Sequence, residues 1–101
     1  MTKKLIPLAI PDIGESEIEL IKQVFDTNFL TEGKFTADFE SEVANYLGVK
    51  NAIACTSCTT ALHTVFECLD IKGKEVIVTD YTYPASAEAI ILAGGIPVLA
   101  D

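Results

Sequence analysis

Four side chains that can bind a metal or exchange electrons lie in one short stretch, CTSCTTALHTVFEC, which runs from Cys55 to Cys68. The stretch contains all three cysteines and the single histidine of the chain. Written as a pattern it is C-x2-C-x4-H-x4-C, the ligand spacing of a zinc knuckle. Its first four residues also form a C-x-x-C pair, which is typical of a redox dithiol. The spacing alone leaves both chemistries open.

The hydrophobic period of the stretch argues against zinc. Apolar residues recur at helical spacing across it, namely Ala61, Leu62, Val65, Phe66 and Leu69. His63 and Cys68 then lie in one helix, and five residues at about 100° each place them about 140° apart around its axis. Two ligands so oriented do not easily share one tetrahedral metal. We therefore predict no metal site, with Cys68 as a small core residue and His63 on the helix surface.

A redox dithiol is the second alternative. Thioredoxins place C-x-x-C between a strand and a helix, where the helix dipole lowers the pKa of the first thiol. Cys55 and Cys58 match that placement. Two features differ from it, because no aromatic residue leads into Cys55 and Pro84 precedes a helix, whereas the thioredoxin cis-proline precedes a strand. The redox function remains open as an alternative.

Leaving the cysteines aside, residues 56–60 (TSCTT) form a turn of small, mostly hydroxyl-bearing residues between a short apolar run and a helix. The N-terminus of a helix offers free N–H groups and positive potential, and small side chains let an anion approach them. These residues therefore predict a phosphate-binding turn, although Ser and Thr are also ordinary helix caps. The usual nucleotide motifs, G-x-G-x-x-G and the Walker lysine, are absent from the sequence.

An aromatic loop, Tyr81-Thr-Tyr-Pro84, follows the next strand. The carboxyl ends of parallel strands meet at one edge of a sheet, so this loop is expected at the same edge as the phosphate turn. A tyrosine there can stack on the flat ring of a cofactor whose phosphate binds in the turn. It can equally close the end of the sheet, and the spacing does not separate these two roles.

Two leading helices are expected before the sheet. Asp12 and Glu15 form a D-x-x-E capping box, and the apolar face behind it comprises Ile18, Ile21, Val24 and Phe25. The residues from Leu30 to Gly33 form a turn. A second helical face follows at Phe35, Phe39, Val43, Tyr46 and Leu47, and Gly48 is placed to end that helix.

Beyond Gly48 the pattern predicts β-α-β-α-β, with strands at 52–55, 76–78 and 96–100. The first strand is a buried apolar run. Pro84 suits the first turn of the last helix, with Thr82 as a possible cap. We therefore predict an α/β fold with a mainly parallel sheet. The 101 residues suffice for a single small domain, divided into a helical segment at 1–50 and a β-α-β-α-β segment at 51–101.

Bulk composition limits the class of partner. The net charge is −8 and the pI about 4.4, so the surface repels nucleic acid and anionic membranes. The longest apolar stretch, residues 89–100, is too short to span a bilayer and contains glycine and proline. The N-terminus does not have the features of a signal peptide, and an odd number of cysteines without one is typical of reduced thiols in the cytoplasm.

Three blocks cover the chain almost end to end: IPLAIPDIGESEIELI, FLTEGKFTADFESEVANYLGVKNAIACTSCTTALH and KGKEVIVTDYTYPASAEAIILAGGIPVLAD. In order and spacing they resemble the DegT/DnrJ/StrS sugar aminotransferases, which are pyridoxal-phosphate enzymes of fold type I. The family usually has Ser-Gly-Thr where this chain has Ser57-Cys58-Thr59. The resemblance implies that residues 57–60 (Ser57, Cys58, Thr59 and Thr60) bind the cofactor phosphate, with the N–H groups of Thr59 and Thr60 as donors.

The resemblance also implies that Tyr83 stacks on the pyridine ring and that Thr31 and Gly33 lie near the substrate. In the family an amino group moves from glutamate to a keto carbon of a nucleotide-linked sugar. That chemistry needs a lysine bonded to the cofactor and an acidic partner for the pyridine nitrogen. None of the seven lysines of this chain matches that lysine, so no catalytic residue is assigned.

Family members are several times longer, so the chain resembles the N-terminal part of their large domain. The first strand would not neighbour the other two, and unpaired strand edges would stay exposed. We therefore expect a chain that is inactive alone and that packs against a missing C-terminal part or forms a homo-oligomer. The alternative from another class is a small α/β binding module without catalysis.

Overall fold

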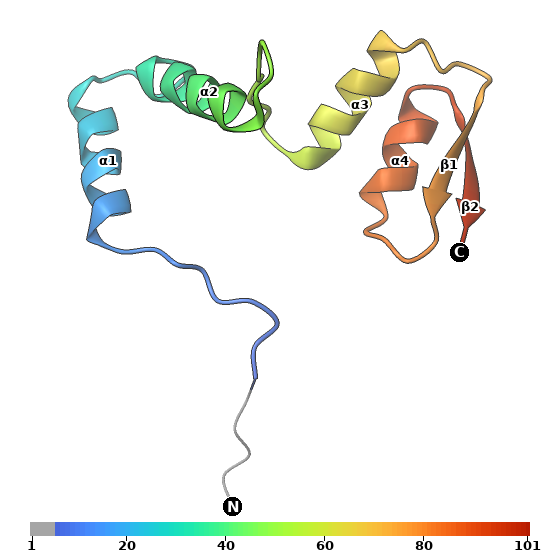
Figure 1. The fold of residues 1–101 in the computed structure, drawn as a ribbon, viewed down its shortest axis with the longest axis horizontal. Helices are drawn as coiled ribbons and strands as arrows, with labels where there is room; N and C mark the ends of the chain where they lie inside the picture. Colours follow the sequence, from blue (N-terminus) through green and yellow to red (C-terminus); the bar gives the residue numbers. More distant parts are fainter. Residues whose placement is uncertain (1–5) are drawn as a thin grey trace, which may run out of the picture. The chain divides into compact units, whose positions relative to one another are not determined.

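The computed structural model describes residues 6–101, which separate into two compact units (Figure 1). The first unit extends to Ala52, and its helices are α1 (Glu15–Asp26) and α2 (Lys34–Leu47). The second unit is Ile53–Asp101, and its elements follow the order α3 (Cys58–Cys68), β1 (Glu75–Thr79), α4 (Ala85–Leu92) and β2 (Ile96–Ala100). Helices and parallel strands together confirm the predicted α/β class.

Helix α1 begins two residues later than the predicted capping box requires. Gly14 is the N-cap in extended conformation, and its N–H donates to Oε2 of Glu17 at 2.6 Å. The box at Asp12 and Glu15 is therefore wrong. Two glutamates, Glu15 and Glu17, suit the first turn of a helix equally well, so the D-x-x-E pattern did not fix where that turn starts.

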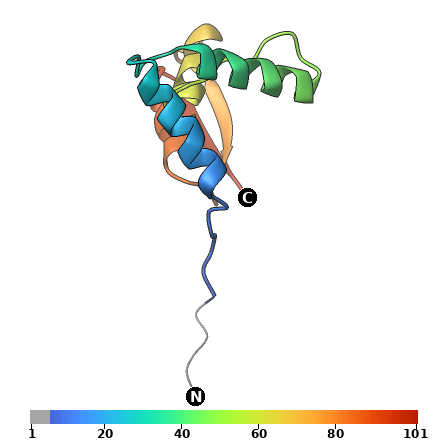
Figure 2. The same ribbon diagram turned by 90° about the vertical axis from the view of Figure 1, so that its left-hand side faces the viewer.

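Helix α2 has the predicted extent and ends as predicted at Gly48. This glycine adopts the left-handed conformation at φ 66°, and its N–H donates to the carbonyls of Ala44 and Asn45. The N–H of Val49 closes the turn on the carbonyl of Ala44 at 3.0 Å. Figure 2 shows α1 and α2 along their length, running in different directions on either side of the turn at residues 27–33.

The prediction of a buried strand at 52–55 is wrong. Among the described residues no strand is assigned to this segment, and 82% of Ile53 is exposed. A strand is held by hydrogen bonds to a neighbouring strand. The two described strands, β1 and β2, pair only with each other, so this apolar run joins no sheet among the described residues.

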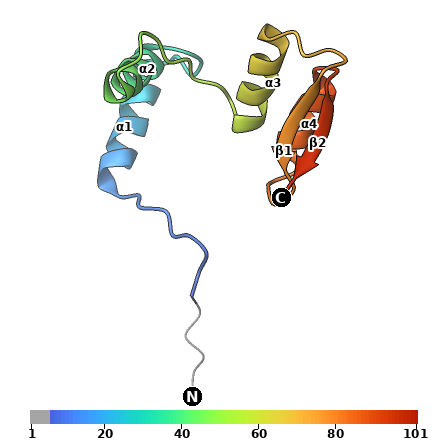
Figure 3. The ribbon, with the colours of Figure 1, turned by 45° about the vertical axis from the view of Figure 1, so that its right-hand side comes forward.

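The predicted strands at 76–78 and 96–100 are confirmed as β1 and β2. They pair in parallel, with Ile77 opposite Val98, and lie side by side in Figure 3. Helix α4 connects them and packs on one face of the pair. Both α3 and α4 run opposite to the strands, so they begin at the end of the unit where the strands finish (Figures 1 and 3).

The core of the second unit is small and centred on α4. Ala89 is fully buried and Ile90 is 1% exposed, with Ala85 and Ile71 beside them. Gly95 lies so close that a methyl group added there would stand 2.7 Å from Cδ1 of Ile71. Because Gly95 has no side chain, the backbone that follows α4 can pack directly against this helix. None of the helices in residues 6–101 has the length and apolar content to cross a membrane.

Candidate cofactor-phosphate site

The N-terminus of α3 is built around Ser57, which is the N-cap in extended conformation. Its Oγ accepts the N–H of Thr60 at 3.1 Å and lies 3.0 Å from Oγ1 of the same threonine. The hydroxyl of Thr56 stands 3.2 Å from Oγ1 of Thr60. Three hydroxyl groups therefore surround the first turn of the helix. Thr56 belongs to the predicted phosphate-binding turn, but it was not among the residues that the resemblance assigned to the cofactor.

The cap decides which N–H groups of α3 remain open. Thr60 already donates to Ser57, and Ala61 donates to the carbonyl of Ser57 at 3.0 Å. The N–H groups of Cys58 and Thr59 have no acceptor within the described residues. The resemblance named Thr59 and Thr60 as phosphate donors, whereas this geometry offers Cys58 and Thr59.

The electrostatics at this helix end suit an anion. The first turn of α3 contains no acidic residue, although the chain has a net charge of −8 and the first turns of α1 and α4 each contain glutamate. The dipole of α3 adds positive potential at the same point. The turn therefore combines two open N–H groups, exposed hydroxyls and no repelling carboxylate. This is the donor set that a phosphate group requires.

Tyr83 lies in the loop between β1 and α4, at the same end of the unit as the start of α3 (Figure 1). Its side chain is 79% exposed, so it does not close the end of the sheet among the described residues. The loop is held at both sides, because Asp80 N–H donates to the carbonyl of Ala100 at 3.1 Å and Ser86 N–H donates to that of Tyr83 at 3.1 Å.

The start of α4 differs from the prediction in one detail. Pro84 directly precedes the helix, as predicted, but Thr82 does not cap it. The Thr82 hydroxyl instead lies 3.2 Å from Oγ of Ser86. Pro84 itself has helical dihedral angles, so the backbone turns before a side-chain cap can reach the first N–H groups.

His63 and Cys68 occupy α3, as the helical period predicted. Nε2 of His63 lies 3.2 Å from Oε1 of Glu67, one turn further along the helix. Cys68 is exposed, so its prediction as a core residue is wrong: the described residues place no second layer over this side of α3. Cys55 and Cys58 are free and exposed as well.

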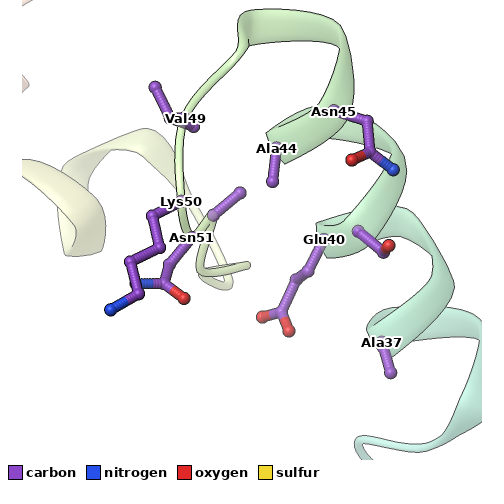
Figure 4. Close-up of a pocket in the computed structure, with 9 residues that line it drawn as sticks. Ala37, Glu40, Ala44, Asn45, Val49, Lys50 and Asn51 are labelled. Carbon is purple, nitrogen blue, oxygen red and sulfur yellow. The ribbon is translucent and has the colours of Figure 1, made fainter.

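Thr31 and Gly33, the predicted substrate residues, lie together in the first unit. Both line a cavity of about 310 Å³ in the turn between α1 and α2. A second cavity of about 330 Å³ lies between α2 and residues 49–52, where Glu40 of the helix faces Lys50 and Asn51 of the extended segment (Figure 4). No predicted site residue lines this second cavity.

Comparison with solved structures defines the class of fold. The chain superimposes on a putative sugar aminotransferase of Streptococcus pneumoniae, solved in its PLP form, with a TM-score of 0.88 and 33% identity over 95% of this chain. An aminotransferase from Psychrobacter cryohalolentis gives a TM-score of 0.85 at 32% identity. Each match covers 25% of the solved chain. The fold is thus the α/β fold of part of a sugar aminotransferase.

Residues 11–101 match the model of the DegT/DnrJ/EryC1/StrS aminotransferase family, and the chain belongs to this family. It is 41% identical to a GDP-perosamine synthase of Caulobacter vibrioides over 98 residues, which is 95% of this chain and 26% of that protein. It is 36% identical to a UDP-4-amino-4,6-dideoxy-N-acetyl-beta-L-altrosamine transaminase of Campylobacter jejuni over 90 residues. The chain spans about a quarter of the length of these relatives.

Proposed function

We propose that this chain forms the cofactor-phosphate-binding part of a pyridoxal-phosphate-dependent aminotransferase that acts on a nucleotide-linked keto sugar, with glutamate as amino donor. The observation that carries the proposal is the composition of the first turn of α3. Two N–H groups without an acceptor lie there beside three hydroxyl groups, and the turn contains no carboxylate. Family membership supplies the cofactor, and the names of the relatives supply the class of substrate.

Each residue of the site has a defined task in this proposal. The N–H groups of Cys58 and Thr59 donate to phosphate oxygens, and the hydroxyl of Ser57 holds the turn in place through Thr60. The ring of Tyr83 stacks on the pyridine ring, since its side chain is exposed and the loop between β1 and α4 that contains it lies at the same end of the unit as the start of α3. The bound cofactor supplies the carbonyl group that takes up and releases the amino group.

We propose that the chain alone binds the cofactor but does not catalyse the amino-group transfer. None of its seven lysines matches the family segment that bonds to the cofactor. We therefore place residues 1–50 and 51–101 in one incomplete domain that packs against further polypeptide, either the rest of such an enzyme or a second copy. The three free cysteines agree with a cytoplasmic location.

The proposal is tested by calorimetric titration of the chain with pyridoxamine 5′-phosphate, which does not react with surface lysines. Pyridoxamine, which has no phosphate, is the matched ligand. The phosphate-bearing compound is expected to bind at least tenfold more tightly, because a charge-assisted hydrogen bond contributes about 1.5–3 kcal/mol. Equal affinity of the two compounds would refute a phosphate site.

The substitution Cys58→Pro tests whether the backbone N–H of residue 58 donates to the phosphate. Proline suits the first helical position, and Ser57 before it is already extended, so the helix is preserved while one N–H is lost. Binding is expected to weaken about tenfold or more. Cys58→Gly, which gives the usual family residue, keeps the N–H and is expected to bind normally. Glu15→Pro at the first position of α1 is the control for the proline itself.

A further inference from the structure

Two cysteines lie on either side of the residue that caps α3, and the proposed function uses neither thiol. Cys55 precedes the N-cap Ser57 by two residues, and Cys58 is the first residue of the helix. Both cysteines are free and exposed. They belong to the same unit, so the local backbone alone sets the distance between them. The question is whether they can form a disulfide and what that bond would change at the start of α3.

The third cysteine of the chain lies too far away to be the partner of Cys58. Cys58 and Cys68 are the first and last residues of α3. Ten steps of 1.5 Å place them about 15 Å apart along the helix axis. A disulfide joins Cα atoms that are at most about 7 Å apart. An intramolecular disulfide of Cys58 therefore has Cys55 as its partner, and Cys68 serves as a control thiol on the same helix.

The capped backbone holds Cys55 and Cys58 just beyond bonding distance. Ser57 is almost fully extended, with φ −160° and ψ 162°. An extended residue sets the Cα atoms of its two neighbours, here Thr56 and Cys58, about 7 Å apart. The chain bends at Thr56, and a right-angled bend there leaves about 8 Å between the Cα atoms of the two cysteines. The disulfide therefore cannot close until the backbone moves.

The backbone movement that closes this gap is a rotation at Ser57. Steric contacts prevent a bend at Thr56 that is much sharper than a right angle, so Ser57 has to leave its extended conformation. An N-cap side chain reaches the first turn of its helix from that extended conformation. The contact that would be lost is the hydrogen bond from the N–H of Thr60 to Oγ of Ser57 at 3.1 Å. The Cys55–Cys58 disulfide and the capped start of α3 therefore exclude each other.

The surroundings of the two cysteines suit a bond that forms and is reduced again. Disulfide formation begins with a thiolate, whose negative charge a nearby carboxylate would disfavour. The first turn of α3 has no acidic residue. Exposed disulfides are among those that small thiols reduce readily, and the disulfides of reducing compartments are typically transient and sense oxidants.

We propose that Cys55 and Cys58 form a reversible disulfide, with hydrogen peroxide as the oxidant, and that this bond prevents phosphate binding at the start of α3. One thiol attacks a peroxide oxygen and becomes a sulfenic acid, while the other oxygen leaves as water. The second thiol attacks the sulfenic sulfur, the S–S bond forms and a second water leaves. The two cysteines thus transfer two electrons and two protons to the peroxide. A small thiol reverses the step by exchange.

The effect on the phosphate follows from the cap. When Ser57 rotates, the open N–H groups of Cys58 and Thr59 lose the arrangement that the capped turn gives them. Because coupling between two equilibria is reciprocal, a bound phosphate favours the reduced cysteines by the same factor. This effect rests on the proposed function, whereas the disulfide and the release of the cap do not.

The first test follows the disulfide in the full chain without a ligand. Equimolar hydrogen peroxide is expected to remove two hydrogen atoms from the chain, as measured by intact mass, and dithiothreitol is expected to restore them. Cys68→Ser should behave in the same way, whereas Cys55→Ser should form no intramolecular bond. A natural chain that keeps its three thiols free, or a Cys55→Ser chain with the same loss of mass, would overturn the proposal.

The second test follows the cap through the amide of Thr60 by NMR. Its hydrogen exchange is expected to become at least tenfold faster in the disulfide form, because the acceptor on Ser57 is withdrawn. The amide of Leu69 donates to the carbonyl of Val65 at 3.0 Å at the other end of α3 and is the control. An unchanged Thr60 amide in the disulfide form would refute the link between the bond and the cap.

The third test connects the disulfide to the phosphate by calorimetric titration. Pyridoxamine 5′-phosphate is expected to bind the oxidised chain about tenfold more weakly than the reduced chain. Cys55→Ser, which alters no proposed donor, should bind equally before and after peroxide. Equal affinity of the two forms of the natural chain would contradict the effect on the phosphate.

Failure of the proposed function gives a different result. In that case the reduced chain binds pyridoxamine 5′-phosphate no more tightly than pyridoxamine, and the intact mass and the Thr60 amide still decide whether the disulfide forms and releases the cap. Tight binding by a reduced chain that forms no disulfide would contradict this inference alone.

Discussion

At the scale of single residues, Ser57 determines what the start of α3 can bind. Its hydroxyl takes up the N–H of Thr60, so the open donors shift by one residue to Cys58 and Thr59. The sequence was sufficient to predict the phosphate-binding turn, because small hydroxyl-bearing residues before a helix are typical of such turns. It could not name the donors, because a serine before a helix can either cap it or contact a ligand. Only the 3.1 Å contact separates these roles.

Cys58 shows that the type of a side chain does not by itself identify the group of that residue that binds a ligand. Its spacing to Cys55, His63 and Cys68 suggested metal or redox chemistry, yet its backbone N–H is the group that the proposed site uses. The side chain matters little if the N–H is the donor. The comparison of Cys58→Gly with Cys58→Pro isolates this point, since only the second removes the N–H.

Glu17 gives a pH-dependent prediction at the same scale. The N–H of Gly14, together with its own backbone N–H and the Ser16 hydroxyl, lowers the pKa of this carboxyl below its ordinary value of 4.5. A lowered folded-state pKa means that the ionised form favours the folded helix. This contribution is complete above about pH 4.5 and is lost as the pH falls through the folded-state pKa.

The measurement is the amide proton shift of Gly14 followed by NMR during acid titration. It is expected to change with a midpoint below 4.5, together with a loss of helix signal from α1. Glu17→Gln should abolish the titration of Gly14. Glu19→Gln leaves the Gly14–Glu17 hydrogen bond in place and should retain it. A midpoint at or above 4.5 would contradict the role of this hydrogen bond.

At the scale of elements, the helices and the β1–β2 pair could be predicted, whereas residues 52–55 could not. Helical spacing and glycine at Gly48 are local signals, and they placed α2 almost to the residue. Strand formation depends on a partner that the local sequence does not specify. Residues 52–55 have the apolar composition of a strand but belong to no sheet among the described residues.

The return of the chain onto α4 yields a prediction about stability. A methyl group at Gly95 would stand 2.7 Å from Cδ1 of Ile71 and 2.9 Å from Cγ2 of Ile90, which is almost fully buried. Gly95→Ala is therefore expected to lower the free energy of unfolding by about 1–3 kcal/mol, as measured by denaturant titration.

A second substitution separates this clash from other effects of the alanine. Ile71→Val removes Cδ1, the nearest atom, so Gly95→Ala should cost less in that background than in the natural chain. An equal cost in both backgrounds would show that the contact with Ile71 is not the cause.

At the scale of the whole chain, burial is distributed unevenly. Among residues 6–101, four of the five buried apolar residues belong to the second unit, namely Ile71, Ala85, Ala89 and Ile90, and the fifth, Ala44, belongs to the first. Many large apolar side chains remain exposed, among them Ile21 and Phe25 of α1 and Ile77 of β1. Such surface is typical of a chain that packs against further polypeptide, as proposed.

This distribution predicts the pattern of amide hydrogen exchange. Protection reports the free energy of local opening, which is small where few apolar side chains are buried. The slowest amides are therefore expected in β1, β2 and α4, around Ile90. The fastest helical amides are expected in α1, which has no buried residue; α3 has none either, but it packs on α4. Ile90→Ala removes the largest fully buried side chain and should cost about 2–5 kcal/mol, collapsing protection throughout the second unit. Ile18→Ala, at 46% exposure in α1, should leave that protection unchanged. Protection of α1 equal to that of α4 would mean that α1 is covered in solution, and would place the missing contact on the apolar face of Ile18, Ile21 and Phe25.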